Sequence, residues 1–122
     1  MQLVNCNNTT HTERSGGVYK VPCATCQNSY FGETIKTLHF RLDQHKAKIR
    51  RGNQSNAIFL HITQQHSIDW TGARFVFNSK SKNLNRLIEQ FFFKTSNNFN
   101  ISSGFFDIDN SLVNFLKLIF KN

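Results

Sequence analysis

The stretch GGVYKVPCATCQNSYFGET, residues 16–34, decides the fold. Within it, residues 18–21 (VYKV) are rich in β-branched and aromatic side chains, which predicts a strand that closes at the following proline. Residues 29–32 (SYFG) have the same character and predict a second strand. The turn between the two strands carries Cys23 and Cys26. The stretch therefore predicts an antiparallel hairpin with a cysteine-containing turn.

Helical and strand patterns alternate after the hairpin. Apolar residues at steps of three, four and seven predict a helix from residue 35 to about residue 51, with Thr34 as its N-cap. Its expected buried stripe comprises Ile35, Leu38, Leu42 and Ile49. Further along, we expect a helix from residue 57 that Asn56 caps and that ends near His66, a strand at 73–77, a helix at 82–94 and a short terminal helix at 112–120. The expected buried stripe of the 82–94 helix comprises Leu84, Leu87, Ile88 and Phe91, with Glu89 beside it.

These patterns predict an α+β fold, in which helices flank a small three-stranded antiparallel sheet. The 122 residues suit one folded domain, and 39% of them are hydrophobic. We expect a loose arm at 1–15, a domain at 16–104 and an apolar helical extension at 105–122.

The charge balance indicates the class of partner. Lys and Arg number 15 against seven Asp and Glu, a formal net charge of +8. Such an excess suits nucleic acid, because basic side chains near phosphates release condensed counterions. The sequence shows neither an apolar run of membrane-spanning length nor a signal peptide, so we expect no membrane partner.

The cysteines indicate a metal site or a redox site. Three Cys in a chain without a signal peptide argue against a disulfide framework, and a nuclear or other intracellular compartment is expected. The spacing of Cys23 and Cys26 is that of a metal knuckle or a redox motif. Cys6 is expected to take no part, and His11 and His39 are expected at the surface.

The hairpin carries a pattern that resembles a known nuclease family. Gly17-Val18-Tyr19, ten intervening residues and then Tyr30-Phe31-Gly32 resemble the paired triplets of GIY-YIG endonucleases, with Val and Phe each standing where the family name has Ile. Three later residues match the family's helix-borne Arg, its His or Tyr partner and its single metal-binding carboxylate: Arg41, His45 and Glu89. Asn98 or Asn100 resembles a further polar residue of the family.

Within that family the chain resembles the nuclease domain of Penelope-like retroelements. There, two Cys sit between the triplets, and a His pair followed by Ile-Asp-Trp comes downstream. Here those residues are Cys23, Cys26, His61, His66 and 68–70 (IDW). The likeness covers about residues 16–104. It implies DNA nicking for a retroelement, and a reverse transcriptase domain of the same element as a partner.

The resemblance assigns a role to each residue of the site. Glu89 would hold Mg²⁺ or Mn²⁺, Arg41 would bind a phosphate oxygen, and Tyr19 would take the proton of the attacking water. Tyr30 and His45 would orient water and phosphate or share the proton transfer. To act as a base, Tyr19 needs a cationic neighbour such as Lys20, Arg41 or the metal ion. The residues expected to bind DNA are Lys20, Lys46, Lys48, Arg50 and Arg51.

Two interpretations of the sequence remain open. Cys23, Cys26, His61 and His66 form a plausible tetrahedral zinc site, with His66 past the end of its helix, although two buried thiols and two surface His would have the same spacing. The chain is then either an endonuclease or a non-catalytic, zinc-stabilised DNA-binding module. Glu33 either orients the site or caps the helix that follows it.

Overall fold

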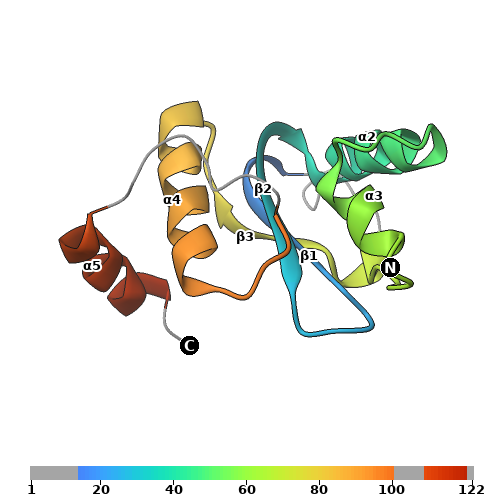
Figure 1. The fold of residues 1–122 in the computed structure, drawn as a ribbon. Coiled ribbons are helices and arrows are strands. Elements are labelled where there is room, and N and C mark those ends of the chain that lie inside the picture. The colour runs from blue at the N-terminus through green and yellow to red at the C-terminus, as the bar shows by residue number, and fades with distance from the viewer. Residues whose placement is uncertain (1–13, 101–108, 121–122) are drawn as a thin grey trace, which may run out of the picture.

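The computed structural model describes residues 14–100 and 109–120 and has the expected α+β architecture. A three-stranded antiparallel sheet of order β2-β1-β3 lies between α4 on one side and α2 with α3 on the other (Figure 1). Cys6, His11 and the expected boundary between residues 104 and 105 lie outside the described residues. The elements are β1 (Ser15–Pro22), β2 (Ser29–Thr37), α2 (Leu38–Arg50), α3 (Ala57–Ile62), the 3-10 turn η1 (Trp70–Gly72), β3 (Arg74–Asn78), α4 (Lys82–Thr95) and α5 (Asn110–Phe120).

The motif residues Val18 and Tyr19 lie in the central strand β1, and their side chains point to opposite faces of the sheet. Tyr19 pairs with Gly32 and Val18 with Glu33, so the predicted hairpin is confirmed with these residues in register. Because successive side chains of a strand alternate, Tyr19 and Val18 point to opposite faces. Val18 faces α4, where it packs in one cluster with Ile88. Tyr19 faces α2, where it contacts His45.

The start of α2 differs from the sequence prediction. Thr34 does not cap it, because Thr34 still pairs with Gly17 inside β2. The N-cap is Thr37, whose hydroxyl accepts from the Phe40 amide at 3.2 Å. Ile35 is therefore a strand residue and is 52% exposed, instead of belonging to a buried helical stripe. Its spacing fitted a helix, but its β-branched side chain and the partner strand favour β structure there.

The later start of α2 also excludes the prediction that Glu33 caps this helix. That residue lies within β2 and does not cap α2. Its side chain approaches α4 instead, with Oε2 lying 4.0 Å from Arg86 Nε.

The main core lies between the sheet and the two C-terminal helices. Its buried members are Val18, Ile88, Phe91, Val113 and Leu116. The expected C-terminal helix is confirmed as α5, and it contributes to this core from outside α4 (Figure 1).

One member of the stripe predicted for α4 was wrong. Leu84 is 40% exposed, and Asn85 is buried in its stead. The Asn85 side chain fits there because its Nδ2 donates to the Ser79 carbonyl at 3.0 Å, just before the helix begins. A buried amide with such a partner loses little of its hydrogen bonding on leaving water.

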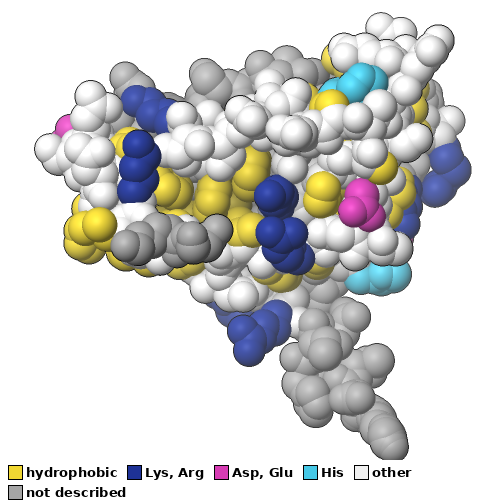
Figure 2. Space-filling model, turned by 90° about the horizontal axis from the view of Figure 1, so that it is seen from below, with side chains coloured by type: hydrophobic (Ala, Val, Ile, Leu, Met, Phe, Trp, Pro, Cys, Tyr) yellow, Lys and Arg dark blue, Asp and Glu magenta, His cyan; other side chains and the backbone are white. Residues whose placement is uncertain are grey.

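The outer face of α5 carries exposed apolar side chains, namely Phe115, Leu118 and Ile119. Figure 2 shows hydrophobic side chains reaching the surface on the α4–α5 side of the molecule. Among the described helices, none is both long enough and apolar enough to cross a membrane.

Candidate active site and metal centre

The phenol of Tyr19 lies over the second glycine of the paired triplets. Tyr19 is fully buried, and a Cβ built on Gly32 would lie 2.5 Å from its hydroxyl oxygen. Any side chain at position 32 would therefore displace the Tyr19 ring. A glycine can be required either for a left-handed backbone or for lack of space. The φ of Gly32 is not in the left-handed region, so the close approach of the Tyr19 ring is what requires glycine here.

Gly32→Ala is therefore expected to destabilise the fold by about 1–3 kcal/mol, the usual size of an overpacking effect. Denaturant unfolding measures the change. Gly52→Asn is the control, because Gly52 has φ +68, a conformation that Asn tolerates, and a Cβ there would meet Phe59 Cζ only at an ordinary contact distance of 4.0 Å. A Gly32→Ala protein as stable as the control would contradict the close approach of the Tyr19 ring to position 32.

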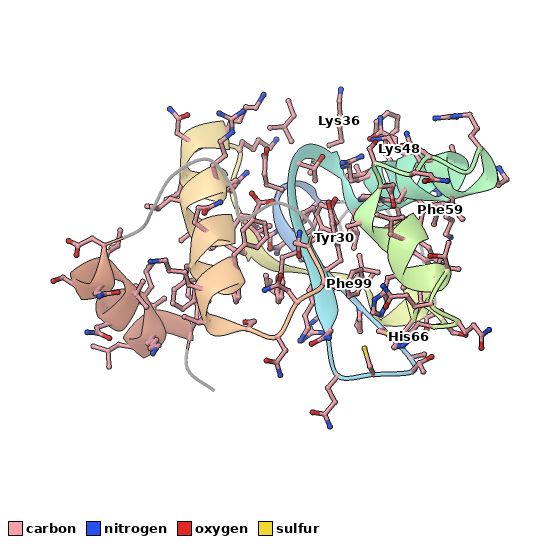
Figure 3. All side chains as sticks on the ribbon, in the orientation of Figure 1. Tyr30, Lys36, Lys48, Phe59, His66 and Phe99 are labelled. Carbon is pink, nitrogen blue, oxygen red and sulfur yellow. The ribbon has the colours of Figure 1, made fainter. Side chains whose placement is uncertain are left out.

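His45, a residue of α2, contacts Tyr19 of β1. It is the buried residue of that helix, and its Nε2 lies 2.8 Å from the Tyr19 hydroxyl oxygen. Tyr30 completes an aromatic triad, with its ring centroid 5.2 Å from that of His45 and 6.2 Å from that of Tyr19. Figure 3 shows Tyr30 between β2 and α3, on the side away from α4. The structure thus brings three of the predicted site residues into contact.

Two charged residues act electrostatically on both tyrosines. Burial raises the pKa of Tyr19 well above its usual value, and Arg41 opposes that rise while Glu89 adds to it. The pKa of Tyr30 is also raised by burial, with Arg41 and Glu89 acting in the same two directions. Arg41 on α2 and Glu89 on α4 thus shift the pKa of both phenols in opposite directions.

Arg41, and not Lys20, is the cationic neighbour of Tyr19. Lys20 follows Tyr19 directly in β1, so its side chain points to the opposite face of the sheet. The positive charge of Arg41 opposes the rise in the pKa of Tyr19, so it favours the phenolate. Arg41 Nη1 donates to Gln44 Oε1 at 3.0 Å, which holds the guanidinium along the helix.

Glu89 sits in surroundings that favour its neutral form. Burial, and then the charge of Glu33, raise the pKa of the Glu89 carboxyl to about 7, while Arg86 acts in the opposite direction. One oxygen of Glu33, Oε1, is buried and has no hydrogen-bond partner among the described residues. Two neighbouring carboxylates with an unsatisfied buried oxygen fit a divalent cation, which would offset both unfavourable charges.

The residues expected to bind DNA are mostly spread along α2. Lys46 lies over the Trp70 ring at 5.1 Å from its centroid. The charge of Lys48 contributes to the lowered pKa of His45, and Figure 3 shows Lys48 on α2. Arg50 and Arg51 are exposed at the C-terminal end of the helix. Lys20 lies apart from this group, on the other face of the sheet.

The two candidate asparagines after α4 both bond to the main chain. Asn100 Oδ1 accepts from the Phe31 amide at 3.0 Å, and Nδ2 donates to the Phe31 carbonyl at 2.7 Å. The side chain thereby closes the outer edge of β2 as a neighbouring strand would. Asn98 Nδ2 donates to the carbonyls of Phe93 and Ser96. Their visible interactions are therefore structural.

A second cluster lies at the hairpin turn. One ligand atom from each of its four residues lies within 4.8 Å of the others, so that they can hold a metal ion. The residues are the predicted Cys23, Cys26, His61 and His66. Sulfur–nitrogen separations are 3.3 Å for Cys23 and His66 and 3.6 Å for Cys26 and His61. Zinc bonded at its usual distances would have tetrahedral sulfur–nitrogen edges of about 3.5 Å. The donor set and its spacing therefore fit a structural metal such as zinc.

Backbone hydrogen bonds also help to organise this cluster. The Ala24 amide donates to the Ser67 carbonyl at 2.8 Å, and the Asp69 amide donates to the Pro22 carbonyl at 2.9 Å. His66 follows the end of α3, as predicted, after Gln65 with φ 68 has turned the chain. Figure 3 shows His66 beside the turn between β1 and β2.

The thiol of Cys23 is prepared for a metal. Burial raises its pKa, but hydrogen bonds from the Cys26 amide, His66, the Thr25 amide and His61 outweigh this effect and lower the pKa to about 6. Metals bind the thiolate, so a lowered thiol pKa favours binding near neutral pH. Neither Cys23 nor Cys26 is in a disulfide.

Sequence reasoning missed the contact that Asn56 makes with His45. Asn56 was predicted only as the N-cap of α3, and its amide Nδ2 also lies 3.2 Å from His45 Nδ1. The N-cap pattern gave no sign of this second partner on a different helix.

Comparison of the chain with protein-family models, with curated proteins and with solved structures found no match. The candidate site is thus defined by its own residues and their geometry.

Proposed function

We propose that this protein is a metal-dependent DNA endonuclease of the GIY-YIG type. The observation that carries the proposal is the contact among Tyr19, Tyr30 and His45, with Arg41 and Glu89 acting on both phenols. Phosphodiester hydrolysis needs an oriented nucleophile and positive charge near the phosphate, and this set can provide both once a cation is bound.

Each residue has a part that suits its environment. Arg41 binds a non-bridging phosphate oxygen and favours the phenolate of Tyr19. Tyr19 positions the attacking water and takes its proton, Tyr30 holds the water and the phosphate in line, and His45 holds the Tyr19 phenol in place. Glu89, with Glu33 beside it, would hold Mg²⁺ or Mn²⁺. The bound ion would stabilise the charge that develops on the phosphate and on the leaving oxygen.

The proposed substrate is DNA, cut for the insertion of a retroelement, with a reverse transcriptase domain of the same element as partner. The net charge of +8 and the basic residues of α2 support a polyanionic substrate. The Cys and His cluster supports the likeness to Penelope-like retroelements, in which the same residue types lie between and after the triplets.

The second candidate is a zinc-stabilised DNA-binding module without turnover. The raised pKa of Tyr19 favours it, because a phenol that stays protonated is a poor base. The deciding experiment is incubation of the protein with supercoiled plasmid and Mg²⁺ or Mn²⁺. Relaxed or linear product that disappears with EDTA supports the nuclease. Salt-dependent binding with no product under either metal supports the binding module.

Arg41→Lys separates phosphate recognition from general charge. Lysine keeps the positive charge but lacks the forked guanidinium, so we expect turnover to fall by about 100-fold with little change in affinity. Lys48→Ala is the comparison, and it should mainly weaken binding and reduce its salt slope by about 1. Plasmid cleavage and binding titrations at several salt concentrations measure both. Equal effects of the two changes would make Arg41 only one more basic residue.

A further inference from the structure

Asn56 makes two hydrogen bonds with opposite ends of its amide. Its Oδ1 accepts from the Phe59 amide at 2.9 Å, which is the N-cap bond of α3. Its Nδ2 lies 3.2 Å from Nδ1 of His45. Asn56 is only 7% exposed and His45 is buried, so water does not compete for these contacts.

The cap bond determines which way the amide faces. A backbone N–H can only donate, so the atom facing Phe59 must be the carbonyl oxygen and the NH₂ group must face His45. The NH₂ group can only donate, so Nδ1 of His45 must be the acceptor and carries no proton. Burial and the charges of Arg41 and Lys48 lower the pKa of His45 to about 3, so the ring is neutral near pH 7. Its one proton is then on Nε2.

We infer that Asn56 is a positioning residue that holds His45 in the Nε2–H tautomer, so that His45 donates a hydrogen bond to the hydroxyl oxygen of Tyr19. The 2.8 Å contact between Nε2 and that oxygen is then an N–H···O bond. His45 therefore does not accept the phenol proton of Tyr19.

The catalytic meaning of this tautomer rests on the proposed nuclease function. The Nε2–H group of His45 points at the Tyr19 oxygen, and the positive charge of Arg41 lowers the pKa of Tyr19, so both favour the phenolate. Tyr19 must therefore lose its own proton to solvent before it takes one from the attacking water, and neither proton passes into the histidine. In this arrangement Asn56 acts on the reaction only through His45.

Asn56→Asp is the sharpest test. Asp caps a helix about as well as Asn and has the same shape, so α3 is retained. Its carboxylate offers His45 Nδ1 an acceptor in place of a donor, which moves the ring proton to Nδ1 or charges the ring. Asn56→Ser keeps a capping oxygen but is too short to provide the donor. Ser81 caps α4, because its hydroxyl accepts from the Leu84 amide. Ser81→Ala removes this cap and controls for the general loss of a helix cap.

Histidine ¹⁵N chemical shifts report the tautomer directly, and the signal of His45 is identified by its absence from a His45→Gln protein. In the wild type at pH 7 we expect Nδ1 without a proton and Nε2 with one. In Asn56→Asp we expect a protonated Nδ1, and plasmid cleavage reduced by about 100-fold or more. Ser81→Ala should leave both the His45 signals and cleavage per folded molecule unchanged.

A wild-type spectrum with the proton on Nδ1 would overturn the inference, as would an unchanged His45 spectrum in folded Asn56→Asp. The wild-type measurement decides the matter even if the variant does not fold. If the tautomer is as inferred but no preparation cuts plasmid, the nuclease proposal fails and the positioning of His45 by Asn56 stands.

Discussion

Glu89→Gln is expected to lower plasmid cleavage by about 1,000-fold or more while DNA binding persists. Glutamine keeps the shape of the side chain but removes the charge that would hold the cation. A catalytic metal contributes several kcal/mol to transition-state stabilisation, and each 1.36 kcal/mol is tenfold in rate. Cleavage rates and binding isotherms, measured on the same preparation with saturating Mg²⁺, test both parts of the expectation.

Asp43→Asn is the matched control, because it removes one negative charge from an exposed carboxylate. Asp43 pairs with His39 on the surface of α2. It should cut at nearly the wild-type rate. If Glu89→Gln also cut at that rate, Glu89 would not hold the catalytic metal.

The same substitution has a pH signature in the absence of metal. The folded-state pKa of Glu89, about 7, lies above its usual value of 4.5. The stability that this group contributes is therefore fully present below pH 4.5 and is lost as the pH rises through about 7. Glu89→Gln carries no such charge, so in EDTA it should be more stable than the wild type above pH 7. Urea unfolding at pH 5 and pH 8 measures this difference, and Mg²⁺ should reduce it at pH 8.

Local pattern predicted the hairpin, the Asn56 cap and the C-terminal helix, because each depends on residues close together in the chain. The predicted start of α2 was wrong for a physical reason. Residues 34–37 fit a helical spacing, but β1 offers a pairing partner as far as Thr37. The pairing of one strand with another is a tertiary interaction that local spacing does not contain.

The two sites differ in how much the sequence revealed. All four residues of the metal cluster were predicted from their types and spacings, and their convergence favours a metal site over free thiols and surface histidines, which the spacing alone left open. The surroundings of Tyr19 were not predicted. Tyr19 is buried by elements that lie apart in the sequence. The effect of Glu33 on Glu89 and the contact of Asn56 with His45 also link elements that no motif connects. These contacts change the pKa values and tautomers on which the chemistry depends.

Removing metal from the cysteine and histidine cluster is expected to lower the melting temperature by about 10 °C or more. Metal binding contributes directly to folding free energy, and each kcal/mol shifts the melting temperature of a domain this size by several degrees. Partial order should survive, because the turn keeps its backbone bonds to residues 67–69. Elemental analysis should find about one zinc per chain, as a four-ligand site predicts.

Cys23→Ser and His66→Ala should each lose zinc and stability together. His39→Ala is the control for His66→Ala, because His39 is an exposed histidine whose visible partner is Asp43. Cys6→Ser is the control for Cys23→Ser, because Cys6 is not expected to be a ligand. Both controls should keep zinc and the wild-type melting temperature. Stable wild-type protein without zinc would remove the structural-metal assignment.

Thiolates favour zinc, whereas carboxylates and water favour magnesium, so the zinc-loaded protein should still need added Mg²⁺ or Mn²⁺ to cut. Full cleavage with zinc alone would mean that the two metal sites do not have separate functions.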